Sequence, residues 1–203
     1  MTVIGLTGPT GSGKGAVGEL LQLRGIPVLD TDQTYHSIVS GESECVGELA
    51  SRFGGEVRTE NGALDRKKLA SIVFCGGEEQ VIRCRDLNAI THKYVLREVR
   101  VWLACCRARG ASVAVVDAPM LFESGFHREC TAVLSVVAEA DVRLARICER
   151  DGISQERALE RIRAQKDVSF YKENSDYVIE NSGTLGELEA RVEDFLADLE
   201  RRG

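Results

Sequence analysis

The residues whose spacing most directly indicates chemistry lie near the amino terminus, in the stretch LTGPTGSGKGAVG. Gly8, Gly13 and Lys14 match the pattern G-x-x-x-x-G-K, and Gly11 adds another glycine inside it. Glycines allow successive backbone N–H groups to curl around phosphate oxygens, and a following helix offers its positive end. A glycine-rich turn without a ligand is the alternative, but an apolar strand pattern precedes the stretch and a helical pattern follows it. We therefore predict a phosphate-binding loop in which Lys14 reaches the β- and γ-phosphates of a nucleotide.

The hydroxyl side chains that normally follow this lysine are missing. Gly15 and Ala16 occupy the positions where a serine or threonine usually supplies one oxygen to magnesium. Magnesium keeps several waters and is bound chiefly through phosphates and one or two carboxylates, so a water can replace the missing ligand. Ser12 and Thr10 carry hydroxyls at other positions of the loop, and we do not expect them to substitute. The change is thus expected to weaken catalysis more than nucleotide binding.

Three aspartates are candidates for chemistry beside this loop. Asp30 and Asp32 close a short apolar run as D-x-D, and we predict that both project from one face of a strand toward the loop. One could take the proton of an attacking hydroxyl while the other orders metal-bound water; an N-cap for the next helix is the alternative. Asp117 follows four apolar residues in AVVDAP, as a carboxylate facing a bound metal would, although a strand-end turn explains that pattern equally well.

An arginine stripe marks the second half of the chain. Arg143, Arg146 and Arg150 fall at i, i+3 and i+7, which places them on one face of a helix. A solvated charged face is one interpretation, and a lid that clamps the transferring phosphate is the other. The three histidines share no metal-ligand spacing, and spacing alone makes His92 an ordinary helix residue.

Five short apolar runs separated by helical patterns predict an α/β fold with a parallel, doubly wound sheet. The runs are 2–7, 26–30, 112–119, 131–138 and 176–181. Helical patterns occupy 14–24, 33–39, 44–53, 65–74, 78–109, 141–151, 154–166 and the stretch from 185, and Asn61-Gly62 predicts a tight turn. The helix-rich segment 33–111 is too long for one crossover, so we expect a helical subdomain inserted into a single domain, 1–203.

Composition limits the possible partners and the compartment. A net charge of −6 over 203 residues gives no general attraction to nucleic acid. Seven cysteines without a C-x-x-C pair indicate reduced, buried thiols rather than disulfides or a zinc site. No signal-peptide pattern opens the chain and no run of 18 apolar residues occurs in it. We expect a cytoplasmic protein without a membrane or nucleic-acid partner, either a monomer or a weak homo-oligomer.

Beyond these motifs, the sequence resembles the dephospho-CoA kinases nearly end to end. The matching segments, in the family's order, are GLTGPTGSGKG, VLDTD, LDRKKLASIVF, LNAITHKYV, VVDAPMLFESG, RICERDGISQERALERIRAQ and DYVIENSG. The loop alone indicates only that a nucleotide binds. LDR with the spaced VF, LNxIxH and P-x-L-F-E are more specific to this family. The resemblance implies an adenylate-kinase-like P-loop fold, with an acceptor-binding insertion at 33–111 and a lid at 146–175. It also implies transfer of the γ-phosphate of ATP, with Mg²⁺, to the 3′-hydroxyl of dephospho-CoA, the last step of CoA synthesis.

The resemblance assigns roles to residues that match the family's motifs. Those expected around ATP are Gly8, Gly11, Ser12, Gly13, Lys14, Gly15, Ala16, Arg150 and Asn181. Asp32 matches the family's catalytic base and Asp30 its partner, and Lys14 and Arg146 complete the expected catalytic group.

The acceptor and metal sites are less completely assigned. Arg66 and His92 fall in the motifs that line the acceptor side in the family. Asp117 is the candidate metal ligand, assisted through water by the aspartates of the D-x-D pattern. Lys93 stands where proline usually follows the histidine, a change we take to be harmless. The lid segment KDVSFYKENS matches only loosely, and its contacts are not assigned.

Three functions are alternatives to dephospho-CoA kinase activity. A nucleoside or nucleoside-monophosphate kinase would share the loop and sheet but has no reason to carry LNAITH. A catalytically weakened nucleotide-binding or regulatory protein is the hypothesis that Gly15 motivates, and it predicts ATP binding without turnover. A GTPase switch is rejected because the chain contains neither D-x-x-G nor N-K-x-D.

Overall fold

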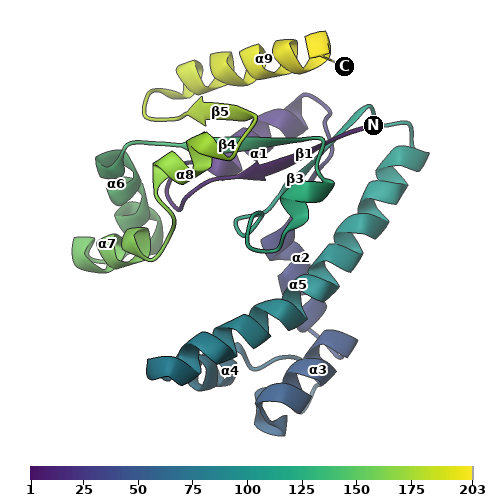
Figure 1. The fold of residues 1–203 in the computed structure, drawn as a ribbon, viewed down its shortest axis with the longest axis vertical. Helices are drawn as coiled ribbons and strands as arrows, with labels where there is room; N and C mark the ends of the chain where they lie inside the picture. Colours follow the sequence, from purple (N-terminus) through teal and green to yellow (C-terminus); the bar gives the residue numbers. More distant parts are fainter. Residues whose placement is uncertain (203) are drawn as a thin grey trace. The chain divides into compact units, whose positions relative to one another are not determined.

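The computed structural model describes residues 1–202 and contains two compact units (Figure 1). The first unit comprises Met1–Leu29 together with the chain from Cys106 onward, and the second comprises Asp30–Cys105. The predicted insertion at 33–111 overlaps the second unit. Each unit has its own hydrophobic core, so each is described by itself.

A five-stranded sheet forms the centre of the first unit. Its strands are β1 (Thr2–Thr7), β2 (Val28–Asp30), β3 (Val113–Asp117), β4 (Ala132–Val137) and β5 (Tyr177–Glu180). Their spatial order is β2-β3-β1-β4-β5, and β1 runs parallel to both β3 and β4. The pairs Leu6↔Asp117 and Thr7↔Ser135 bring the carboxyl ends of three strands together. The predicted parallel α/β sheet is confirmed, and its central strand is the one that feeds the glycine-rich loop.

Helices cover this sheet because alternate strand residues face opposite sides. The helices of the first unit are α1 (Lys14–Leu23), α6 (Ala140–Asp151), α7 (Gln155–Arg163), α8 (Val168–Glu173) and α9 (Leu185–Arg202). Ile4 and Leu6 of β1 share one buried cluster with side chains of α1 and α9. Between them, Gly5 faces the other side, where an added Cβ would lie 2.8 Å from Leu121. That side is therefore packed to the backbone itself.

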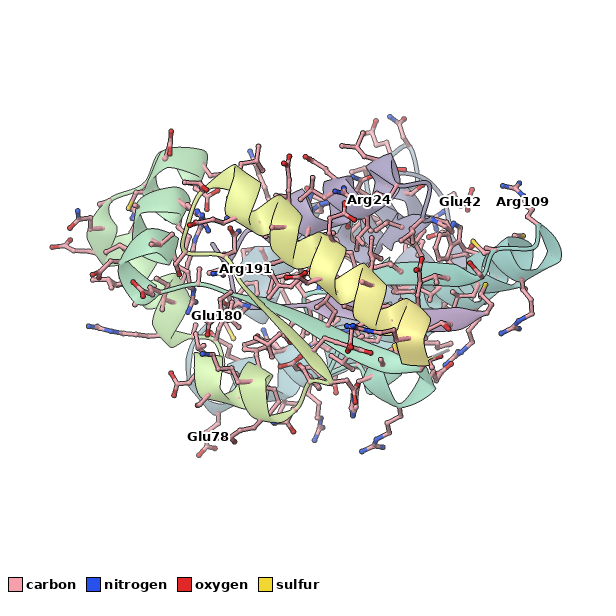
Figure 2. All side chains as sticks on the ribbon, turned by 90° about the horizontal axis from the view of Figure 1, so that it is seen from above. Arg24, Glu42, Glu78, Arg109, Glu180 and Arg191 are labelled. Atoms are coloured by element: carbon pink, nitrogen blue, oxygen red, sulfur yellow. The ribbon has the colours of Figure 1, made fainter. Side chains whose placement is uncertain are left out.

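The closing helix α9 packs the carboxyl-terminal part of the chain against the sheet. It lies beside β5 in Figure 1 and crosses over the strands when seen from above in Figure 2. Leu188, Val192 and Phe195 are its buried residues in the sheet cluster. Arg24, which follows α1, forms an ion pair with Glu193 of α9. The predicted amphipathic closing helix is confirmed.

The second unit is helical. It contains α2 (Thr31–Val39), α3 (Glu44–Phe53), α4 (Arg66–Val73) and most of α5 (Gly77–Ala108), with a short 3₁₀ helix at Gly55–Val57. Buried side chains from all four helices form its core, among them Val46, Val73 and Tyr94. The tight turn predicted at Asn61-Gly62 is present, because Thr59 N–H donates to the carbonyl of Ala63 at 2.9 Å.

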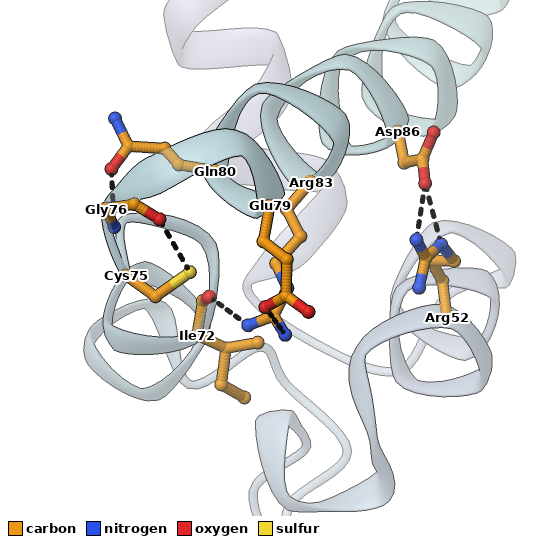
Figure 3. Close-up of polar contacts among 8 residues, drawn as sticks. All are labelled: Arg52, Ile72, Cys75, Gly76, Glu79, Gln80, Arg83 and Asp86. Carbon is orange, nitrogen blue, oxygen red and sulfur yellow. Dashed lines mark hydrogen bonds and ion pairs between the residues drawn. The ribbon is translucent and has the colours of Figure 1, made fainter.

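Polar contacts of α5 hold the shorter helices in register (Figure 3). The guanidinium of Arg83 donates to the carbonyl oxygen of Ile72 at 2.7 Å, which satisfies a carbonyl at the end of α4. Arg52 of α3 makes two bonds to Asp86 Oδ2, at 2.8 and 2.6 Å. The second unit thus has side-chain clamps of its own in addition to its core.

The cysteines only partly follow the sequence-based expectation. All seven are free, as a reduced chain requires. Cys45 and Cys106 are buried, as predicted, but Cys75 and Cys105 are exposed, so the prediction of buried thiols is wrong for those two. Burial raises the pKa of Cys45 to about 11 and that of Cys130 to about 12, which keeps both thiols protonated at neutral pH.

The chain around Lys166 differs from the predicted elements. The segment after Lys166, for which no element was predicted, forms the short helix α8, and the helix predicted over 154–166 ends at Arg163. Within residues 1–202, none of the helices combines the length and apolar character that crossing a membrane requires.

Candidate active site

The loop between β1 and α1 is built on three glycines with positive φ. The angle is +150° at Gly8, +77° at Gly11 and +85° at Gly13. Residues with side chains rarely adopt such angles, so glycine is required at these positions. Gly13 is also the N-cap of α1, whose first N–H groups have no carbonyl partners within the helix. The loop therefore has the anion-binding features that the sequence predicts.

The back of the loop is packed so closely that side chains could not be added there. A Cβ at Gly8 would collide with the carbonyl oxygen of Val136 at the end of β4. A Cβ at Gly13 would collide with the side-chain amide of Asn181. These two glycines are thus needed for space as well as for backbone angle.

Two side chains hold the carbonyl oxygen of Ser12. Asn181, which follows β5 and is 6% exposed, donates from Nδ2 at 2.8 Å. Arg146 of α6 donates to the same oxygen at 3.4 Å and to the carbonyl of Asn181 at 2.8 Å. The structure therefore brings both predicted residues to the loop, where they contact its backbone. Their contacts with ATP stay predictions.

Lys14 and Asp117 form an ion pair. Asp117 ends β3 at the same edge of the sheet as the loop and is only 6% exposed. The Coulomb attraction between two charges is larger where water is largely excluded, so Asp117 holds the lysine against the sheet edge. The pair places the Asp117 carboxylate at the phosphate loop, and phosphates that bind there compete with it for Lys14.

The loop offers magnesium a sparse set of ligands. Within residues 1–202, no group of three or more His, Cys, Asp or Glu side chains could hold a metal ion alone. Magnesium bound to a nucleotide takes most of its ligands from phosphates and water, with one or two carboxylates, and Asp117 fits that requirement. Gly15 is exposed, and an added Cβ there has no neighbour within 4 Å. A side chain at this position would therefore fit.

Comparison with known proteins identifies the family. Residues 2–187 match the sequence profile of the dephospho-CoA kinase family. The dephospho-CoA kinase of Anaeromyxobacter dehalogenans is 38% identical over 199 residues, which cover 98% of this chain and 92% of that protein. The chain belongs to the dephospho-CoA kinase family. A second relative of that name, from Corynebacterium glutamicum, is 34% identical over 98% of this chain and 100% of its own length.

Solved structures agree with this family on the fold. The crystal structure of TT1252 from Thermus thermophilus is 33% identical, has a TM-score of 0.80, and aligns over 98% of this chain and 97% of its own. Shikimate kinase from Acinetobacter baumannii, at 17% identity and a TM-score of 0.55 over 100% of this chain and 94% of its own, shares the fold alone. The chain is thus a kinase with an α/β P-loop fold.

The two aspartates expected to act in a dephospho-CoA kinase lie at the start of α2. The prediction that both close a strand is wrong, because β2 ends at Asp30 and Asp32 lies in the first turn of the helix. Asp30 is the N-cap, and its Oδ1 accepts from the N–H groups of Asp32 and Gln33 at 2.8 and 3.0 Å. Asp32 is exposed. Its side chain is therefore accessible for a catalytic role, whereas that of Asp30 is partly engaged in capping.

The candidate acceptor residues lie on two other helices of the second unit. Arg66 is the exposed first residue of α4, and its charge opposes the raised pKa that burial gives Tyr35. His92 is a partly buried residue of α5. Lys93, the substituted neighbour of His92, donates to Glu48 of α3 at 2.7 Å. The departure from the family's proline therefore adds a contact within the helical unit.

The arginine stripe divides into different environments. Arg150 bonds to the neighbouring Asp151 at 2.7 and 3.0 Å, and within residues 1–202 it makes no hydrogen bond to the loop. Arg143 is buried and donates from Nε to the carbonyl of Thr10 at 2.9 Å. Gln165 accepts from the N–H of Thr10 at 2.7 Å. Sequence reasoning placed Arg143 in a stripe that could clamp phosphate, did not predict its bond to Thr10, and assigned Gln165 no role.

We predict that two glycines of the loop respond oppositely to the same substitution. Gly13→Ala forces a side chain into a positive φ, which costs about 1–2 kcal/mol, and into the amide of Asn181, so thermal stability and ATP affinity both fall. Gly15→Ala meets open space and a favourable helical position, so melting temperature is kept or raised and ATP affinity changes less than about twofold. Thermal melts and ATP titrations of both variants test this. Equal losses in the two variants would contradict it.

Proposed function

We propose that this chain transfers the γ-phosphoryl group of ATP to the 3′-hydroxyl of dephospho-CoA, giving coenzyme A and ADP. The observation that carries the proposal is the assembled loop with its Lys14–Asp117 pair, in a chain that matches the family over residues 2–187. A partly buried cation and the N-terminus of a helix at one sheet edge are suited to binding a polyphosphate. The full-length match to dephospho-CoA kinases supplies the acceptor.

The proposed chemistry relies on positioning and on charge neutralisation, as phosphoryl transfer generally does. Lys14 leaves Asp117 to contact the β- and γ-phosphates, and Asp117 is the residue that would then hold magnesium. Magnesium, when bound, would neutralise charge on the phosphates. Asp32 takes the proton of the attacking 3′-hydroxyl, and Arg146 keeps the loop in shape while its charge faces the phosphates.

The remaining assignments rest on the family resemblance. We propose that the insertion at 33–111 binds dephospho-CoA through Arg66 and His92, that 146–175 acts as a lid, and that Arg150 and Asn181 contribute to the ATP site. The free thiols are compatible with the proposed cytoplasmic location. A monomer or weak homo-oligomer remains our proposal for the assembly.

The function is tested by ADP release from Mg-ATP with purified protein. We expect release to depend on dephospho-CoA, and adenosine and AMP to serve poorly as acceptors. The product should be phosphorylated at the 3′-hydroxyl, which mass spectrometry of the acceptor establishes. ATP binding without acceptor-dependent release would favour the alternative of a catalytically weakened nucleotide-binding protein, which Gly15 motivates.

The role of Asp32 can be separated from the structural role of its neighbour. Asp32→Asn is expected to lower kcat by roughly 10²- to 10⁴-fold, the usual contribution of a general base, without changing the melting temperature. Asp30→Asn should lower kcat much less, because asparagine is an equally good N-cap and preserves the start of α2. The kcat values from the ADP-release assay provide the comparison. If Asp32→Asn retains most of the activity, another group is the base.

Restoring the missing hydroxyl should adjust the metal dependence without creating the activity. Gly15→Ser places its hydroxyl in open space, so it fits without strain. We expect the magnesium concentration for half-maximal rate to fall by roughly two- to fivefold, since one of several ligands changes from water to protein. Gly15→Ala, which lacks the hydroxyl, is the matched control. An inactive parent chain that Gly15→Ser activates would show that the hydroxyl is essential and overturn this expectation.

A further inference from the structure

Both backbone polar groups of Thr10 are held by side chains from distant parts of the chain. Arg143 of α6 donates from Nε to the carbonyl oxygen at 2.9 Å, and Gln165 accepts from the N–H at 2.7 Å. Thr10 lies between Gly8 and Gly11, two of the three glycines that give the loop its unusual backbone angles. Glycine is the residue with the most conformational freedom to lose, so this part of the loop needs external restraint.

Gln165 connects the loop to the segment between α7 and α8. It lies two residues after Arg163, where α7 ends, and three residues before Val168, where α8 begins. Further along α8, Tyr171 is buried against the ring of Phe122, with centroids 6.2 Å apart. The hydrogen bond from Thr10 therefore links the loop to the chain that forms this helix.

Arg143 is a buried cation behind the loop. It is 3% exposed, and desolvation lowers its pKa from the usual arginine value. In the described part of the chain no carboxylate hydrogen-bonds to it, and its Nη2 is buried without a partner. Asp167 and Tyr171 lie close enough to influence its charge but do not neutralise it by contact. An unpaired buried charge is costly, and a negatively charged ligand nearby reduces that cost.

We propose that Arg143 and Gln165 are positioning residues that clamp the Thr10 peptide and couple phosphate binding to the conformation of residues 164–173. Neither residue needs to touch the nucleotide. The clamp keeps the loop in its binding shape before ATP arrives, so less binding energy is spent on ordering it. ATP in turn stabilises the clamped loop, and through Gln165 it steadies α8, as reciprocal coupling requires. The inference rests only on the ATP-binding part of the proposed function.

The test is ATP binding measured without acceptor, by calorimetric titration of the full chain. Gln165→Met keeps the side-chain length but removes the acceptor, and we expect it to weaken ATP binding roughly three- to tenfold, the worth of one net hydrogen bond. Arg143→Gln removes the charge and should weaken binding roughly tenfold or more. Arg143→Lys, which keeps the charge, should recover part of the loss.

Matched controls come from the same region. Gln155→Met and Arg163→Gln change exposed residues of α7 whose side chains make no hydrogen bond to the loop within residues 1–202. They should leave ATP affinity within about twofold of the parent chain. In the ADP-release assay the clamp variants should raise KM for ATP more than they lower kcat. A purely structural role would instead lower melting temperature and active fraction while leaving KM for ATP unchanged.

Hydrogen exchange measures the coupling itself. ATP should slow amide exchange in Val168–Glu173 of the parent chain and of Gln155→Met, but much less in Gln165→Met. Clamp variants that bind ATP as tightly as their controls, or that retain the full protection of α8, would overturn the inference. A parent chain that does not bind ATP at all would instead refute the proposed function.

Discussion

The phosphate loop must stay open around an anion although its three glycines make its backbone intrinsically flexible. Gly8, Gly11 and Gly13 give the loop its required backbone angles, and each of them also increases the number of backbone conformations accessible to it. Bonds to the loop's own carbonyl and amide groups remove that freedom. Because the anion needs the N–H groups on the binding side, the restraint has to come from behind.

The architecture of the first unit supplies that restraint from three directions. The central position of β1, between β3 and β4, fixes where the loop starts. The end of β5 brings Asn181 to the carbonyl of Ser12, and α6 brings Arg146 to the same oxygen. The sheet order therefore has a direct chemical consequence. Loss of both donors would leave the carbonyl of Ser12 unpaired, and a buried unpaired carbonyl costs about 1–3 kcal/mol.

The features that sequence could predict are those determined by neighbours in the chain. Short apolar runs indicated the strands, helical spacing indicated the helices, and the positive-φ glycines of the loop follow from a local pattern. The structure of Asp32 was misjudged because D-x-D at a strand end and an N-cap followed by a first helical turn have the same letters. The partners of Thr10 were beyond prediction, since its contacts lie 133 and 155 residues away and depend on how helices pack on the sheet.

The charges around the loop bear on how much the absent hydroxyl at position 15 matters. Lys14 and Asp117 neutralise each other in a nearly buried pair, whereas Arg143 has no carboxylate hydrogen-bonded to it among the described residues. In the function we propose, bound phosphates would take Lys14 and leave the Asp117 carboxylate available to a metal ion. A hydroxyl at position 15 would add only a neutral oxygen to such a site, whose energetics would be set mainly by these full charges.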